Sequence, residues 1–187
     1  MADFTLTAAP ILGGYNQTIA GCTLTERTDL AMVSLAIPQK GKAKLTKALK
    51  EGFGLSMPTP VKSTSKDGVR LLQTSADQLM LIFPHDRPDA VAHVREKIGE
   101  TAYLTDQTDV WVILELDGEM SRDALERLSP IDLSADQFVE GANARTVMEH
   151  MGALVMRTGK DKFMLASASS SAKSFLHAVE TSLHYID

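Results

Sequence analysis

The sequence predicts an α+β fold in which two split βαβ halves of the ferredoxin-like kind pack together as one unit. One observation is the order of the patterns, which run strand, helix, strand, strand, helix, strand and then begin a similar series. Another is that the apolar runs at 30–37, 79–83 and 110–114 do not alternate with polar residues. A lone ferredoxin-like sheet has helices on one face and water on the other, so its strands should alternate. The length of 187 residues suits one large domain or two small ones built as a unit.

The chain divides into an arm and two halves. Residues 1–19 are predicted to form an extended or irregular arm, because Pro10 and two adjacent glycines interrupt every pattern. Residues 20–107 are predicted to form the first half, and residues 108–187 the second half.

In the first half, Leu45, Leu49 and Phe53 recur at helical spacing and lysines cover much of the remaining surface. This pattern predicts an amphipathic helix that ends near Gly54. The elements of this half are expected as a strand at 22–27, a strand at 30–37, a helix at 42–53, a loop at 55–68, strands at 69–74 and 77–83, a helix at 88–99 and a short edge strand at 102–105.

The second half begins with another long apolar strand. Ser121 is expected to cap a short helix whose first turn contains Asp123. The later elements are expected as strands at 143–149, 152–157 and 162–167, a turn at Gly159, and a final helix that starts at 169–171.

Strands with two apolar faces need cover on both sides. Either the two half-sheets cover one another, or another chain covers them, and the two arrangements are compatible. Internal packing is the first expectation, because buried strands usually indicate core before interface. An uncovered face would expose more apolar surface than monomers tolerate.

Composition and charge exclude several classes of protein. Nineteen basic against 24 acidic residues give a net charge of −5, which argues against a nucleic-acid binder. The single cysteine, Cys22, cannot form an intrachain disulfide and suits a reducing compartment; it is interpreted as a small apolar core residue. The first residues do not resemble a signal peptide, and no apolar stretch approaches the length of a membrane span. We therefore expect a cytoplasmic protein without a membrane partner.

The side chains that could do chemistry do not form a recognisable set. None of the histidines falls in a cluster of metal ligands; they are His85, His93, His150, His177 and His184. Glu115 and Asp117 flank a strand end as a general acid and base could, but a buried strand reaching water is the simpler interpretation. The glycine stretches at 13–15 and 159–162 match no nucleotide-binding motif.

Other residue groups suggest structure or contacts. Lysines at 40–50 could bind an anionic partner or the glutamate tail of a folate, although a solvated helix face is the simpler interpretation. Arg145 and Arg157 lie on strands expected to be central, so they need buried partners. Core filling is expected for three clustered methionines, with a partner contact as the alternative; they are Met148, Met151 and Met156.

Several motifs occur in a fixed order along the chain. The early ones are DLAMVSLAIPQKGKAKLTKALKEGFGLSMPTP and VRLLQTSADQLMLIFP. The C-terminal ones are a leucine-rich helix, an S-P-I-D-L connector, a G-A-x-A-R-T strand, R-T-G and an A-x-S-F-x-H-A-x-E helix. From about residue 19 onward the chain resembles the gamma subunits of heterotetrameric sarcosine oxidases. It departs from them at Leu79, where the family commonly has tryptophan.

The resemblance implies a T-protein-like folate-binding fold, related to the T-protein of glycine cleavage. It also implies that flavin, NAD, zinc and tetrahydrofolate are held by partner subunits, namely the alpha, beta and delta subunits. In such complexes sarcosine or a related N-methyl amino acid is oxidatively demethylated. This chain would then supply no catalytic, cofactor-binding or metal-binding residue.

Three functions remain open at this point. The preferred one is a non-catalytic gamma subunit with a structural and assembly role. The second is a stand-alone folate-binding or aminomethyltransferase-like protein, and the third is a regulatory domain that binds a small molecule at the interface of a homodimer.

Overall fold

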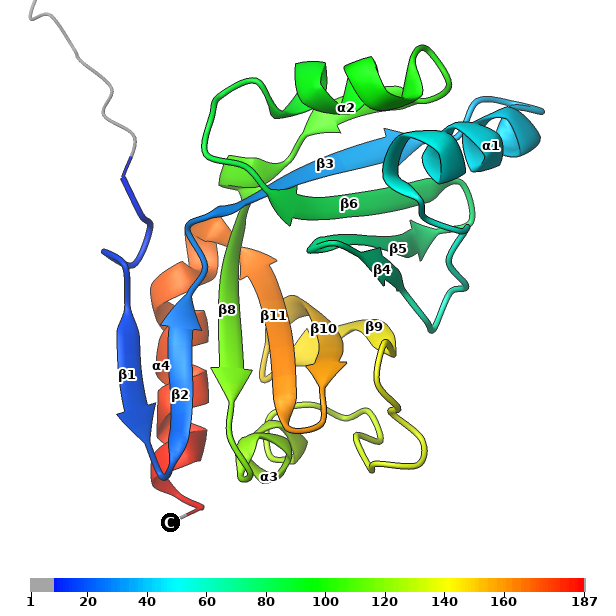
Figure 1. The fold of residues 1–187 in the computed structure, drawn as a ribbon. Helices are drawn as coiled ribbons and strands as arrows, with labels where there is room; N and C mark the ends of the chain where they lie inside the picture. Colours follow the sequence, from blue (N-terminus) through cyan, green and yellow to red (C-terminus); the bar gives the residue numbers. More distant parts are fainter. Residues whose placement is uncertain (1–8, 187) are drawn as a thin grey trace, which may run out of the picture.

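The computed structural model describes residues 9–186, which fold into two antiparallel sheets with helices on their outer sides (Figure 1). Residues 1–8 of the predicted arm, and residue 187, lie outside the described residues. The remainder of the arm includes a short strand, β1.

The five-stranded sheet has the strand order β4-β5-β6-β3-β7, and all its neighbours are antiparallel. This is the predicted split βαβ arrangement, extended by β4 at one edge. Its elements are β3 (Leu30–Ala36), α1 (Lys42–Phe53), β4 (Thr64–Lys66), β5 (Val69–Ser75), β6 (Gln78–Pro84), α2 (Ala90–Ile98) and β7 (Tyr103–Asp106).

The six-stranded sheet has the strand order β1-β2-β8-β11-β10-β9, again antiparallel throughout. Its elements are β1 (Asn16–Ile19), β2 (Cys22–Glu26), the 3-10 turn η1 (Thr108–Val110), β8 (Trp111–Asp117), α3 (Ser121–Glu126), β9 (Asn143–Met148), β10 (Met151–Gly159), β11 (Lys162–Ala168), the 3-10 turn η2 (Ser169–Ser171) and α4 (Ala172–His184).

Strand β2 belongs to a different sheet from the one expected for residues 20–107. It pairs with β8 of the second half, with Leu24 opposite Leu116. In the five-stranded sheet β3 lies between β6 and β7, whereas in the six-stranded sheet the corresponding β8 lies between β11 and β2. In the six-stranded sheet β2 therefore takes the position that β7 takes in the five-stranded sheet.

Three apolar clusters form the core. One packs α1 and α2 against the five-stranded sheet, and another packs α3 and α4 against the six-stranded sheet. The third lies between the two sheets and joins β3, β5 and β6 to β8, β10 and β11. Its buried members are Leu30, Met32, Leu72, Met80, Ile82, Ile113, Leu154, Met156, Met164 and Ala166.

The third cluster confirms that the two halves cover one another. On one face of β3, Met32 is fully buried in this cluster. On the opposite face, Val33 and Leu35 are fully buried against α1 and α2. The apolar faces therefore do not require a partner chain to cover them. Within residues 9–186, no helix has both the length and the apolar character that crossing a bilayer requires.

The halves are also joined by backbone hydrogen bonds. Ser63 N donates to Gly141 O at 2.9 Å, and Asn143 N donates to Val61 O at 3.0 Å. Lys62 and Ala142 form an isolated antiparallel bridge between the same two segments. The loop before β4 is thereby fixed to the start of β9.

The turn that contains the glycine pair of the arm binds a carboxylate of the same chain through backbone N–H groups. Glu26, 7% exposed at the end of β2, accepts hydrogen bonds from Leu12 N at 2.9 Å and from Gly14 N at 2.7 Å. Gly13 and Gly14 both have positive φ, which L side chains rarely adopt. The turn thus holds residues 12–14 against the six-stranded sheet.

Tyr15 connects the same segment to α4 through a hydrogen bond from its hydroxyl to Glu180. Burial raises the pKa of Tyr15 above its ordinary 10.0, and the hydrogen bond and charge of Glu180 raise it further. The folded-state pKa is therefore above the unfolded one, so this stabilisation is complete below about pH 10 and is lost as pH rises through the folded-state pKa. In a tyrosinate absorbance titration, we expect a component of the folded chain to ionise at higher pH than in the unfolded chain. Tyr15→Phe should remove this late component; identical titration of the folded natural chain and the Tyr15→Phe variant, apart from the loss of one tyrosine of ordinary pKa, would contradict this expectation.

Candidate functional site

A cleft opens between the two sheets, and we call it the inter-sheet cleft. Its volume is about 470 Å³. The five-stranded sheet contributes Arg70 and Ile82 to its walls, and the six-stranded sheet contributes Glu115, Lys162 and Met164. Residues far apart in the sequence therefore meet at this junction, where ligand sites commonly form.

One wall of the cleft contains a network of ion pairs centred on Glu115. Arg27 Nη1 lies 2.9 Å from Glu115 Oε2, and Lys162 Nζ lies 3.0 Å from Glu115 Oε1. Arg27 also binds Asp29 at 2.7 Å, and Lys162 binds Asp117 at 3.1 Å. The hydrogen bond to Asp29 is the main cause of a raised pKa at Arg27, and the one to Glu115 is the main cause at Lys162.

This network decides between the two interpretations of the predicted carboxylate pair. Both Glu115 and Asp117 are bound to the same lysine, and the side chain of Glu115 is only 17% exposed. Two cations at contact distance occupy both carboxylate oxygens of Glu115. The pair is therefore an electrostatic link within the sheet.

Arg70 lies on the opposite wall, on β5, in a different setting. Its Nη1 donates to Ser63 Oγ at 2.7 Å, and Ser63 Oγ donates in turn to Gly141 O at 2.9 Å. Among residues 9–186, no carboxylate lies within ion-pair distance of Arg70. Burial lowers its pKa, although the charge of Glu140 opposes this shift.

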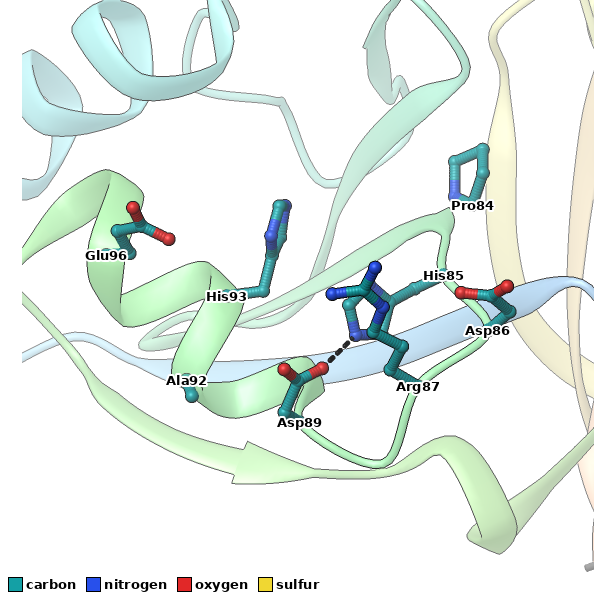
Figure 2. Close-up of a pocket in the computed structure, with 8 residues that line it drawn as sticks. All are labelled: Pro84, His85, Asp86, Arg87, Asp89, Ala92, His93 and Glu96. Carbon is teal, nitrogen blue, oxygen red and sulfur yellow. Dashed lines mark hydrogen bonds and ion pairs between the residues drawn. The ribbon is translucent and has the colours of Figure 1, made fainter.

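A second hollow, which we call the histidine hollow, has a volume of about 440 Å³ and lies between the end of β6 and α2 (Figure 2). Pro84 borders both hollows. The residues that line it are Pro84, His85, Asp86, Arg87, Asp89, Ala92, His93 and Glu96.

Two histidines that the sequence places eight residues apart meet in this hollow. The ring centroids of His85 and His93 lie 5.2 Å apart, and each lies 5.5 Å from the ring of Phe83. Figure 2 shows His85 Nε2 bonded to Asp89 Oδ1, at 2.7 Å, and this bond is the main cause of a lowered pKa at Asp89. Within the described part of the chain, no group of three or more metal-ligating side chains comes together. Sequence reasoning missed this pair, because a strand end and the following helix show no spacing that predicts it.

The remaining histidines lie on the surface. His150, His177 and His184 are all exposed. Within residues 9–186, none of them belongs to a group of side chains that could hold a metal ion. The interpretation of surface histidines therefore fits these three.

Cys22 is a buried residue at the start of β2, as expected for an apolar core cysteine. It is 0% exposed, Ser121 Oγ lies 3.7 Å from its Sγ, and a Cβ on Gly118 would come within 2.7 Å of its Cα. The expectation that Ser121 caps α3 is wrong, because Ser121 is itself helical and its hydroxyl points to Cys22.

We expect the Cys22 thiol to react only when the chain opens. A thiol reagent should modify the native chain slower than the denatured chain by a factor on the order of a thousand or more, since labelling requires global unfolding. The rate can be followed by absorbance, with denatured chain as the reference. Rapid modification under native conditions would show that β2 detaches from β8.

The two predicted arginines have different positions. Arg157 on β10 is 8% exposed and is bound by backbone carbonyls, which fits the expected structural role. Arg145 is exposed on β9, which is an edge strand, so its expected central position is wrong.

The lysines and methionines follow their simpler interpretations. The lysines at 40–50 are exposed, and Lys47 pairs with Glu51 at 3.8 Å. Met148 and Met156 are fully buried in the core, whereas Met151 is partly buried.

The fold is similar to that of a chain of heterotetrameric sarcosine oxidase from Corynebacterium sp. U-96. The TM-score is 0.76 at 20% identity, and the match covers 89% of this chain and 86% of that chain. It is also similar to glycine cleavage system aminomethyltransferase T from Bartonella henselae, with a TM-score of 0.62 at 12% identity. That match covers 89% of this chain and 53% of the other, so this chain spans about half of the aminomethyltransferase.

Comparisons with protein-family models and with curated protein sequences give no match. The fold is therefore assigned from the similarity to solved structures alone. The chain has the T-protein-like folate-binding fold, and it shares this fold with a chain of a sarcosine oxidase and with an aminomethyltransferase.

Proposed function

We propose that this chain is a non-catalytic subunit, of the gamma type, of a heterotetrameric flavin-dependent oxidase. The complex would oxidatively demethylate sarcosine or a related N-methyl amino acid, coupled to tetrahydrofolate. The observation that carries the proposal is the end-to-end match to one chain of a heterotetrameric sarcosine oxidase, 89% of this chain against 86% of that one. A match of nearly whole chains is expected of a subunit with the same place in an assembly.

The side chains of the two hollows are consistent with a non-catalytic role for this chain. In the inter-sheet cleft, Glu115, Arg27 and Lys162 neutralise one another and are not free to act on a substrate. In the histidine hollow, His85 is bonded to Asp89, but the residues that line the hollow include no hydroxyl or thiol nucleophile. Under this proposal flavin, NAD, zinc and tetrahydrofolate are held by the alpha, beta and delta subunits.

The test is to co-express this chain with the flavin-binding oxidase subunits of the organism from which it comes. The isolated chain should be colourless and inactive towards sarcosine, and a tagged chain should co-purify the yellow subunits at fixed stoichiometry. Omitting this chain should lower the yield of assembled oxidase. Sarcosine oxidation by the isolated chain would refute the proposal, as would assembly of the complete oxidase without it.

The second candidate is a stand-alone folate-binding or aminomethyltransferase-like protein. The similarity to the aminomethyltransferase favours it, although this chain spans only about half of that enzyme. It predicts that the isolated chain binds tetrahydrofolate, which a calorimetric titration can measure. Heat of binding at a stoichiometry of one would favour this candidate over the subunit.

A further inference from the structure

Arg27, Arg70 and Arg157 lie in or beside the core, and their guanidinium groups are satisfied to different degrees. A fourth arginine, Arg122, lies over the ring of Phe163, and its buried Nη1 has no hydrogen-bond partner among the described residues. Arg27 binds the carboxylates of Asp29 and Glu115. Arg157 makes four hydrogen bonds to backbone carbonyls. Arg70 makes one, to the hydroxyl of Ser63.

This difference is significant because a guanidinium carries five N–H donors in a rigid fork. Removing such a group from water costs free energy that only acceptors can offset. Arg70 is partly buried against Ser63 and Ile82, and among residues 9–186 it has neither a carboxylate partner nor a second acceptor. Burial is the main cause of its lowered pKa, which is consistent with an incompletely solvated charge.

The space in front of Arg70 has the size and character of a ligand site. The inter-sheet cleft holds about 470 Å³, and small-molecule sites commonly occupy roughly 300–1,000 Å³. Its apolar lining includes Leu30, Ile82 and Met164, which are also members of the core cluster between the sheets. An apolar floor with a few placed polar groups is typical of such sites.

The other charges of the cleft leave Arg70 as the anchor. Arg27 and Lys162 are already bound to Glu115, so they contribute little free positive charge. Lys66 and Asp67 also line the cleft, but both are exposed residues of opposite charge, and the Lys66 ammonium lies beside Gly54. A ligand carboxylate at Arg70 could accept two parallel N–H bonds, the geometry in which arginine binds most strongly. Glu115, on the facing wall, would repel an anion from that side and direct it towards Arg70.

We infer that the inter-sheet cleft binds a small organic carboxylate with a compact apolar group. The carboxylate pairs with the guanidinium of Arg70, and the apolar group packs on Leu30, Ile82 and Met164. This site does not depend on the proposed subunit function, because every residue in it belongs to this chain.

Benzoate and its neutral isostere benzamide are suitable probes for the full chain. By calorimetry or chemical-shift titration, benzoate should bind in the millimolar range or tighter and at least about tenfold more tightly than benzamide. Shifts should centre on Leu30, Ile82 and Met164. Sodium sulfate, which has no apolar part, should bind more weakly than benzoate.

Two variants and a matched control locate the binding. Arg70→Gln keeps a donor for Ser63 and removes the charge, so it should weaken benzoate binding about tenfold or more. Ser65→Tyr keeps Arg70 and fills the cleft from the exposed strand position opposite it, and it should weaken both probes. Arg145→Gln removes an exposed arginine of the edge strand and should leave binding unchanged.

The inference is overturned if benzoate does not bind, if benzamide binds equally well, or if Arg70→Gln binds benzoate like the natural chain. If Arg70→Gln fails to fold, Ser65→Tyr decides, and unaltered benzoate binding by that variant overturns the inference. The proposed subunit function is tested by co-purification, so the two can fail separately.

Discussion

Replacing Arg157 by methionine is expected to destabilise the isolated chain by about 3–5 kcal/mol. The guanidinium of Arg157 donates from Nη1 to Phe138 O at 2.9 Å and from Nη2 to Lys160 O at 2.7 Å. Further bonds reach Ala135 O at 3.2 Å and Gly159 O at 3.1 Å. One side chain thus fixes the loop after α3 to the turn between β10 and β11. Methionine fills a similar volume but donates nothing, so the buried carbonyl of Phe138 and three partly buried carbonyls lose this partner.

The measurement is urea unfolding of the full chain, followed by far-UV circular dichroism. Arg145→Met is the matched control, because it removes the same groups from an exposed position on β9 and should change stability by about 0.5 kcal/mol or less. Equal effects of the two substitutions would show that the carbonyl cage of Arg157 contributes nothing to the free energy of unfolding.

Introducing a carboxylate between the sheets with Met32→Glu should cost more than about 4 kcal/mol, a large share of a total stability of about 5–15 kcal/mol. Met32 is 0% exposed in the cluster that joins the two halves. A carboxyl can enter this layer only in its neutral form, so its folded-state pKa would rise above the unfolded value of about 4.3. The penalty should therefore be greatest at neutral pH and shrink as pH falls towards about 4.

Ser34→Glu is the control for this substitution. Ser34 lies two residues further on the same face of β3 and is partly exposed, so the new carboxylate can reach water. Chemical unfolding at several pH values compares the two variants. If Met32→Glu were no more damaging than Ser34→Glu, the sheets would not be packed together in the isolated chain, and their facing surfaces would be available to a partner.

The sequence predicts the individual elements well where a local pattern decides them. The helix at 42–53 matches α1, because Leu45 and Leu49 recur on the face that packs on the sheet. The non-alternating run at 79–83 correctly indicates a strand covered on both sides, since Leu79, Leu81 and Phe83 face the helices and Met80 and Ile82 face the other sheet.

The sequence predicts less well where distant segments meet. The weak alternation of Cys22 and Leu24 indicates which side chains point inward, but it does not say which strand lies alongside. Arg145 has a strand-like neighbourhood in the sequence, and only the sheet order shows that β9 is an edge. The inter-sheet cleft joins Arg70 to Glu115 and Lys162 through tertiary packing, which no spacing along the chain reveals.

The position of β2 beside β8 has a consequence for how the protein is made. Arg27, directly after β2, bonds to Glu115, a residue 88 positions later. The hairpin of β1 and β2 therefore leaves the ribosome before β8 and finds this neighbour only after the intervening five-stranded sheet has been translated. Contacts of such long sequence separation slow folding, and an unpaired strand that waits is open to wrong pairing. The β1–β2 hairpin is therefore made early but can join its sheet only late in folding.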